Sequence, residues 1–465
     1  MFDLLTNGFG RDCEGLRRRE FLRVGTLGLG GLTLPGLLAL RAMGAESVVK
    51  ETSVVVLNLQ GGPTHIETFD PKMTAPREYR AMFGEVKTKI PGVTFGSHFP
   101  KLASLADRMA IVRCYRHGIG SHGKAAEHVM AGGNATGANM GSLFARIAGV
   151  NSLRTGMPNC TVITPPAVGK QYRKLGAQTS RVTQVGTLSD AYKPFDPSSG
   201  GDIVKNMQLR IPENRLGDRR TLLAGLDRFK RKIDSTGVLG GADEFQQQAF
   251  DVILGGISSA FDMSQEDARL LERYDTSRFE IPSHIKKKKR NVPAQSPISL
   301  GKQMLMARRL IEADCRFITV TSAGWDMHGN AFGINDGMPL LGPAVDKAVS
   351  AFLEDLTERG LSEKVLLVIT GEFGRTPRIN KKGGRDHWGN LCTLAFVGGG
   401  LPMGQVIGRS DRTASVPSGD TVSSSNVLAT VMGSLLDLGR VRLLPGIPSD
   451  IARALNDSRP IPQLS

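Results

Sequence analysis

The stretch KVLLVIT, residues Lys364–Thr370, runs directly into GEFGRTPRINKKGGRDHWGN, residues Gly371–Asn390. The first part is apolar and rich in β-branched residues, which is typical of a buried strand. The second part gathers acidic and basic side chains, a histidine and one of the chain's two tryptophans. A buried strand that ends in such a dense polar set indicates a functional edge, since ligands bind at the carboxyl ends of strands in open parallel sheets.

Strand-like runs of the same kind recur along the chain and alternate with segments whose apolar residues follow helical spacing. This alternation predicts an α/β fold with a mostly parallel central sheet flanked by helices. The expected strands are Thr52–Gln60, Met109–Tyr115, Cys160–Pro165, Cys315–Ser322, Lys364–Thr370 and Leu391–Gly399, and the clearest helices are Ser299–Asp314 and Pro339–Gly360.

Residues of about 170–295 differ from this pattern. They are polar, contain helical stretches and end in the basic run IKKKKR, residues Ile285–Arg290. We expect a helical or loop insertion within one α/β domain that spans residues 46–465, with the basic run as a solvated loop.

Residues 1–45 have the parts of an export signal. Three arginines, Arg17–Arg19, precede the uncharged run Val24–Leu40, and small residues follow around Ala45. A basic segment, a mildly apolar segment and a small-residue site make up a cleavable signal peptide. The pattern RRxFLR resembles the twin-arginine export signal. The sequence therefore predicts a twin-arginine signal peptide, a periplasmic or secreted protein, and no stable membrane span after cleavage. A retained membrane anchor is the alternative.

The charge balance indicates the kind of partner that the protein binds, and the cysteines exclude some kinds of metal site. A formal net charge of +15 favours anionic partners such as phosphates, sulfates, acidic polysaccharides or nucleic acid. The few aromatic residues are not interleaved with the basic runs, so we expect no nucleic-acid partner. The five cysteines show no CxxC pair, which excludes a zinc knuckle. Their number leaves room for one or two disulfides, but buried free thiols are favoured.

Residues with metal-binding or catalytic chemistry follow several expected strands. Asp326 and His328 are two positions apart, so a turn can aim both at one ion. Asp386 and His387 are adjacent, so one of the two is expected to orient a ligand. Imidazole and carboxylate groups together suit a divalent metal: zinc, calcium, magnesium or manganese. The candidate metal ligands are Asp326, His328, Glu372, His387, His65 and Asp70, and the candidate catalytic residues are Ser121, His122, Lys124 and Arg375.

The order of the motifs is more specific than any one of them. The chain carries GGPxHxxTFDPK, HGxxxxHxxxG, GWDxH, GEFGRTPxxN and GRDHWG in this order. The series resembles a large family of bacterial twin-arginine-exported proteins of unknown function, placed in the alkaline-phosphatase-like superfamily of sulfatases and phosphomutases. The resemblance covers nearly all of the chain after the leader. It implies an alkaline-phosphatase-like three-layer sandwich, one or two divalent metals at the carboxyl edge of the sheet, and hydrolysis of phosphate or sulfate esters.

The resemblance also implies roles for individual residues. Asp326 and His328 match the Asp/His pair that holds one metal, although relatives separate the two by more residues. His387 matches the final metal histidine of the superfamily. Where relatives carry an Asp-His turn after a strand, this chain has Glu372 and Phe373, so one ligand of the pattern is replaced.

The end of the first strand and the nucleophile depart further from the superfamily pattern. Gln60 stands where relatives carry a metal aspartate, with His65 or Asp70 as substitutes. The nucleophile of relatives lies at a helix N-terminus, which matches His122 with Ser121 beside it. Ser121 can attack an ester if His122 acts as a base or a ligand.

Three interpretations of the function stay open at the level of sequence. The first is the metal-dependent ester hydrolase, in which Lys124, Arg375 and Arg385 are expected to hold the anionic substrate. The second is a catalytically degenerate protein that binds anionic glycans or envelope components. The third is an isomerase or transferase on the same fold, since a fold does not fix a reaction.

Overall fold

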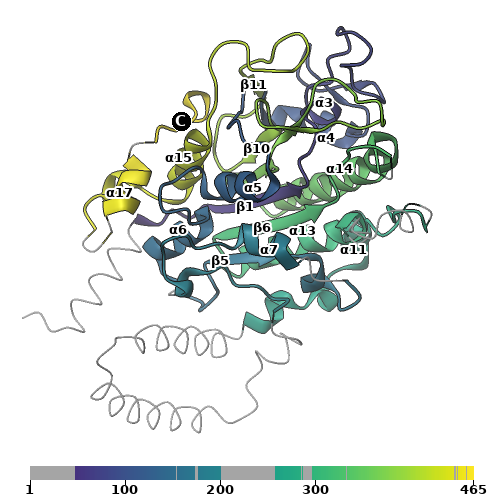
Figure 1. The fold of residues 1–465 in the computed structure, drawn as a ribbon. Helices are drawn as coiled ribbons and strands as arrows, with labels where there is room; N and C mark the ends of the chain where they lie inside the picture. The colour runs from purple at the N-terminus through teal and green to yellow at the C-terminus, as the bar shows by residue number, and fades with distance from the viewer. Residues whose placement is uncertain are drawn as a thin grey trace, which may run out of the picture.

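The computed structural model describes residues 48–152, 154–172, 176–199, 257–283, 285, 296–330, 332–444, 447, 449–456 and 458–465 (Figure 1). The expected signal peptide at residues 1–45 and the basic run at residues 286–290 lie outside the described residues, as does much of the expected insertion. No helix among the described residues is long and apolar enough to cross a membrane.

A seven-stranded sheet forms the centre of the protein, with the strand order β11-β4-β10-β7-β1-β6-β5. β10 runs antiparallel to both neighbours, and every other neighbouring pair is parallel. The strands are β1 (Ser53–Gln60), β4 (Met109–Val112), β5 (Cys160–Ile163), β6 (Phe317–Ala323), β7 (Val365–Thr370), β10 (Leu394–Gly398) and β11 (Gln405–Ile407). The expected α/β fold with a mostly parallel central sheet is confirmed.

β1 lies in the middle of the sheet, between β6 and β7. All of its residues are buried. Successive side chains of a strand point to opposite faces, so Val55, Leu57 and Leu59 join one hydrophobic core while Val54 and Val56 join the other. Burial on both faces explains why the run is apolar without the alternation of a half-exposed strand.

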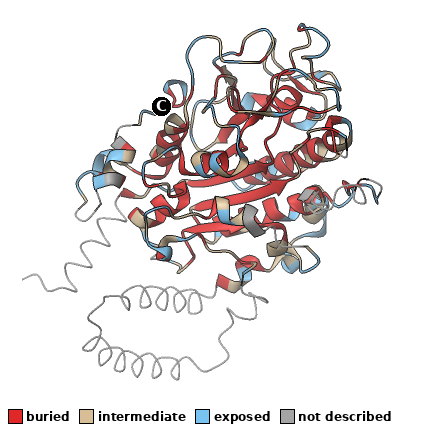
Figure 2. Cartoon of the chain, viewed as in Figure 1, coloured by how far each residue is buried: buried red, intermediate tan, exposed pale blue. Residues whose placement is uncertain are grey.

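Helices cover both faces of the sheet and complete a three-layer sandwich. α13 (Ser296–Glu312) and α14 (Ile334–Glu358) contribute to the core on the face of Val55. α5 (His122–Ala131), α6 (Met140–Ala148) and α15 (Ser424–Leu435) contribute to the core on the opposite face. Figure 2 shows the sheet and the helix surfaces that face it as buried.

Shorter elements complete the described part of the chain. The other helices are α3 (His65–Thr68), α4 (Pro100–Ser104), α7 (Gly176–Val182), α11 (Ala268–Tyr274), α16 (Leu438–Val441) and α17 (Ser449–Asn456). The 3₁₀ helices are Ala106–Arg108, Pro165–Val168, Asp190–Tyr192, Ile257–Phe261, Met263–Gln265 and Pro462–Leu464. Two small antiparallel sheets pair β2 (Glu85–Lys87) with β3 (Thr94–Gly96) and β8 (Gly374–Arg375) with β9 (His387–Trp388).

α14 begins at Ile334, earlier than the helix expected from Pro339. The side chain of Asp336 accepts a hydrogen bond from the Gly333 N–H at 2.8 Å and so caps the helix start. Pro339 and Pro343 consequently lie inside the helix.

The cysteines of the described residues, Cys114, Cys160, Cys315 and Cys392, are buried free thiols, as the sequence favoured. Burial raises the pKa of Cys315 and of Cys392 to about 12. Thiols of this kind carry almost no thiolate at neutral pH, so Cys315 and Cys392 are not candidate nucleophiles.

Candidate metal centre

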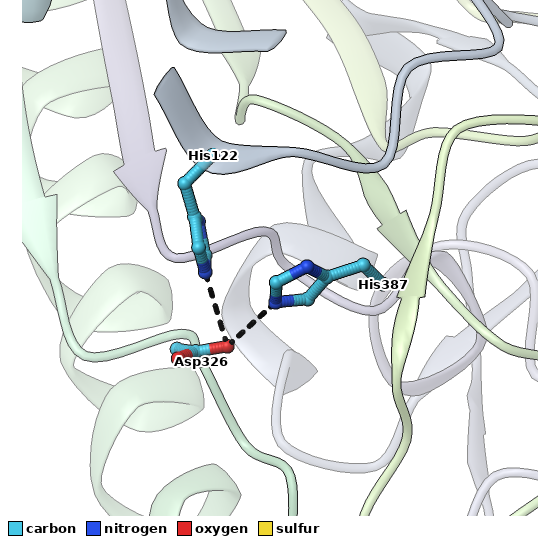
Figure 3. Close-up of side chains that lie close together, drawn as sticks. All are labelled: His122, Asp326 and His387. Carbon is cyan, nitrogen blue, oxygen red and sulfur yellow. Dashed lines mark hydrogen bonds and ion pairs between the residues drawn. The ribbon is translucent and has the colours of Figure 1, made fainter. Parts of the chain in front are cut away.

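Side chains from different segments meet where β1, β6 and β7 end. Asp326 and His328 follow β6, Glu372 follows β7, His387 lies on β9, and His122 is the first residue of α5. Figure 3 shows His122 and His387 approaching Asp326 from two different segments. We call Asp326, His122, His328 and His387 the histidine–aspartate cluster.

The turn after β1 ties the ends of β6 and β7 together. Gly61 has a φ of +114°, and a Cβ at this position would lie 2.5 Å from the backbone nitrogen of Asp326. Only glycine permits this conformation and this approach. The Gly61 N–H donates to both carboxylate oxygens of Glu372, at 2.8 and 2.9 Å. The buried Gln60 accepts a hydrogen bond from the Trp325 N–H through its carbonyl oxygen.

One oxygen of Asp326 is the focus of the cluster. Its Oδ1 lies 2.9 Å from His328 Nε2, 3.3 Å from His387 Nε2 and 3.5 Å from His122 Nε2. The ligand atoms of His122, Asp326 and His387 all lie within 4.8 Å of one another. Around a tetrahedral zinc ion, with bonds of about 2.0–2.1 Å, ligand atoms are about 3.3 Å apart. The three distances to Oδ1 are close to that value.

Each imidazole of the cluster has its other nitrogen held by an oxygen. The Nδ1 partners are Asp386 for His328 (2.9 Å), Glu372 for His122 (2.8 Å) and the Gly120 carbonyl for His387 (2.9 Å). An Nδ1–H that donates to such an oxygen leaves the Nε2 lone pair free in the neutral ring. Metal-binding histidines are commonly oriented in this way, by a hydrogen bond from the ring nitrogen that does not bind the metal.

Two of these Nε2 atoms face one another closely. His328 Nε2 and His387 Nε2 are 2.9 Å apart. Two unprotonated imidazole nitrogens at this distance repel unless a proton or another cation lies beside them. In this structure Arg375 supplies positive charge there, since its Nη2 donates to Asp326 Oδ1 at 2.6 Å. The donor set of three imidazoles and one carboxylate fits a divalent ion such as zinc.

The electrostatics of the cluster favour cations. Burial alone would raise the pKa of Asp326, but hydrogen bonds from His122 and His387 and the charge of Arg375 hold it well below its usual range. Burial disfavours a charged His122, yet its hydrogen bonds to Asp326 and Glu372 raise the pKa of His122 to about 9. The two carboxylates therefore draw positive charge to this edge of the sheet.

Glu372, a candidate ligand, contacts His122 Nδ1, on the side of the ring away from Asp326 Oδ1. It is buried, with its oxygens engaged by the Gly61 N–H and by His122 Nδ1. Phe373 is fully buried, and its ring centroid lies 4.5 Å from that of His387 and 4.9 Å from that of His122. An aromatic ring thus packs against two histidines of the cluster at the place where the resemblance implied a further ligand.

Ser121 and Lys124 lie exposed in the first turn of α5. Ser121 is the N-cap residue, and its hydroxyl makes no cap hydrogen bond. The N-terminus of a helix carries partial positive charge and holds anions well. The hydroxyl of Ser121 is therefore free at the positive end of a helix whose first residue, His122, belongs to the cluster.

His65 and Asp70 have other partners. His65 Nε2–H donates to the Ala414 carbonyl at 2.9 Å, and burial lowers the pKa of His65 to about 4. Asp70 accepts a hydrogen bond from the hydroxyl of Ser410. Both residues lie on or just after α3, into which the chain turns after β1. The structure does not bring them into the histidine–aspartate cluster.

Other groups at this edge of the sheet also have defined partners. The Gly120 carbonyl orients His387, and a backbone oxygen has no sequence signal. Arg385, expected to hold an anion, is fully buried and pairs with Glu67 Oε1 at 3.1 Å. Of the adjacent pair in GRDHWG, Asp386 orients His328 while His387 faces the cluster.

The fold and the site define the class of this protein: an α/β sandwich with a candidate metal centre at the carboxyl edge of its central sheet. Residues 51–443 match the family described as "Protein of unknown function (DUF1501)", and the chain belongs to that family. No curated protein matches the chain.

Several solved structures are similar to this chain. The PsFucS1 sulfatase from Pseudoalteromonas sp. has 12% identity and a TM-score of 0.34, with 85% of this chain and 71% of that chain covered. The lipoteichoic acid synthase LtaP from Listeria monocytogenes has 10% identity and a TM-score of 0.35, with 89% and 74% covered. Ps i-CgsB, in complex with k-i-k-neocarrahexaose, has 9% identity and a TM-score of 0.32, with 88% and 77% covered. At such low similarity, the function of this chain has to be argued from its own residues.

Proposed function

We propose that this protein is an exported, metal-dependent hydrolase of phosphate or sulfate esters, of the alkaline-phosphatase-like kind that its motifs resemble. The observation that carries the proposal is the convergence of three imidazole Nε2 atoms on Asp326 Oδ1, each ring with its Nδ1 held by an oxygen. Export by the twin-arginine route rests on the leader sequence.

Asp326, His328 and His387 would hold the ion, and His122 would be the fourth ligand. The ion would polarise an ester oxygen and stabilise the negative charge that develops on the transferring group. With the ion bound, Asp386, Glu372 and the Gly120 carbonyl would each accept from the Nδ1–H of one ring and leave its Nε2 to coordinate.

The first turn of α5 supplies the remaining groups. Ser121, with its free hydroxyl, is the candidate nucleophile, and the positive end of α5 together with Lys124 would hold the anionic part of the substrate. The net reaction consumes one water and yields an alcohol and inorganic phosphate or sulfate. The formal charge of +15 is consistent with anionic esters, including those of polysaccharides.

Metal analysis combined with an activity assay tests the proposal. Purified protein, dialysed against zinc, calcium, magnesium or manganese, is expected to retain about one divalent ion per chain. The loaded protein is expected to hydrolyse an aryl phosphate or an aryl sulfate. Protein that retains none of the four ions and is inert toward both esters would contradict the proposal.

The second candidate is a non-catalytic binder of anionic glycans. It is favoured by Phe373, which fills the place of an implied ligand, and by the engagement of Glu372 with Gly61. If this candidate is right, sulfated polysaccharide binding survives in His387→Ala and Asp326→Ala, and the unmutated protein shows no turnover.

Glu372→Gln is expected to weaken zinc binding. A glutamine cannot accept two hydrogen bonds from the Gly61 N–H through equivalent oxygens, and it no longer offers His122 a charged acceptor. Loss of a partner that orients a ligand costs about 10- to 100-fold in metal affinity. Competition with a chromophoric chelator measures the affinity. Glu354→Gln, at an exposed position of α14, is the matched control and should leave it unchanged.

A further inference from the structure

Arg375 is buried beside the histidine–aspartate cluster, with 1% of its side chain exposed. A guanidinium group has five N–H donors in a fixed plane. In this protein acceptors face all three of its nitrogens. They are the Gly62 carbonyl for Nε (2.9 Å), the Arg385 carbonyl (3.1 Å) and His328 Nε2 (3.4 Å) for Nη1, and the Gly61 carbonyl and Asp326 Oδ1 (2.6 Å) for Nη2.

In this structure each of the five N–H groups of Arg375 therefore has an acceptor within the protein. The five acceptors come from three segments: the turn after β1, the segment after β6, and the loop between β8 and β9. Arg375 therefore joins the three segments that build the edge of the sheet. A lysine could not replace it, because a single ammonium cannot reach acceptors spread in this way.

Two of the acceptors are candidate metal-ligand atoms. Asp326 Oδ1 and His328 Nε2, which lie 2.9 Å apart, both face the guanidinium. The guanidinium thus stands next to the atoms that a metal would bind and offsets their mutual repulsion.

We propose that Arg375 is a positioning residue that gathers Asp326 Oδ1 and His328 Nε2 into ligand geometry before a metal binds. This role replaces the substrate-binding role expected from the sequence. The inference rests on the metal centre of the proposed function, and it concerns how that centre is assembled.

Cobalt binding tests the inference, because the visible spectrum of Co²⁺ reports its coordination geometry. Arg375→Met, which keeps much of the side-chain volume, is expected to bind Co²⁺ about tenfold or more weakly than the unmutated protein, with an altered spectrum. Arg378→Met, at an exposed position of the loop that follows β8, is the matched control and should change neither quantity. In Arg375→Ala, millimolar methylguanidinium is expected to restore affinity and spectrum, and ethylammonium is not.

The outcomes separate this inference from the proposed function. If the unmutated protein binds no Co²⁺ or Zn²⁺, the metal centre itself is refuted and the inference falls with it. If the unmutated protein binds metal and Arg375→Met matches Arg378→Met in affinity and spectrum, only the inference is overturned. If circular dichroism shows that Arg375→Met is unfolded, the methylguanidinium experiment with Arg375→Ala tests the inference instead. Recovery of the cobalt spectrum with methylguanidinium alone supports the inference, and failure to recover it overturns the inference.

Discussion

His387→Ala is expected to abolish stoichiometric metal binding, and ester hydrolysis with it, while the protein stays folded. His387 Nε2 lies 3.3 Å from Asp326 Oδ1 and 2.9 Å from His328 Nε2, so its removal takes away a candidate ligand. Loss of a partner that merely orients a ligand weakens metal binding about 10- to 100-fold, so loss of a ligand should cost about a hundredfold or more. The side chain is 25% exposed, so its truncation leaves only a partly enclosed gap.

Metal content after dialysis and turnover of aryl phosphate and aryl sulfate give the measurement. His128→Ala is the control, because His128 lies in the last turn of α5, at the opposite end of that helix from His122. The control should keep metal and activity. Full metal content in His387→Ala would refute the assignment of this histidine, and equal losses in both variants would point to damage of α5 and its surroundings instead.

The rule that functional residues follow strand ends foresaw much of the candidate site. Asp326 and Glu372 follow β6 and β7, the two neighbours of β1, and parallel neighbours end at the same edge. His387 returns to this edge because β9 pairs with β8, which begins directly after Phe373. The strand-end rule was sufficient for Asp326 and Glu372, which follow expected strands, whereas the pairing of β9 with β8 that places His387 was not predicted from the sequence.

The parts that the sequence did not foresee depend on contacts between distant segments. The Gly120 carbonyl that orients His387 is a backbone group, and its sequence carries no sign of its partner. His65 follows β1 closely, so the strand-end rule placed it at the site. The chain instead turns into α3, and His65 donates a hydrogen bond to the Ala414 carbonyl. The Gly61 and Gly62 carbonyls likewise accept from Arg375 because of the conformation of their turn, which the sequence does not specify.

Gly61→Ala is expected to destabilise the protein and displace the candidate metal centre together. An alanine at φ +114° is strained, and its Cβ would lie 2.5 Å from the Asp326 nitrogen and 2.9 Å from the Trp325 carbonyl carbon. These neighbours are backbone atoms, so relief requires β1 and the segment after β6 to move apart. Backbone strain of about 1–3 kcal/mol and overpacking of about 1–3 kcal/mol suggest a loss of roughly 2–6 kcal/mol in the free energy of unfolding. The shift would also lengthen the Gly61 N–H bonds to Glu372 and move Asp326 away from the three imidazoles.

Gly419→Ala separates conformational strain from displacement of the site. Gly419 has a φ of +103°, close to that of Gly61, but no atom lies within 4 Å of its Cβ position. It should therefore lose only about 1–2 kcal/mol, the cost of a positive φ, and keep its metal affinity. Urea unfolding measures the stability of both variants, and chelator competition measures their zinc affinity. Equal stability losses with unchanged zinc affinity in both variants would show that the approach of β1 to Asp326 is not what holds the ligand group together. A larger loss in Gly61→Ala, accompanied by weakened zinc binding, would show that one glycine sets both the packing of the sheet edge and the geometry of its candidate metal centre.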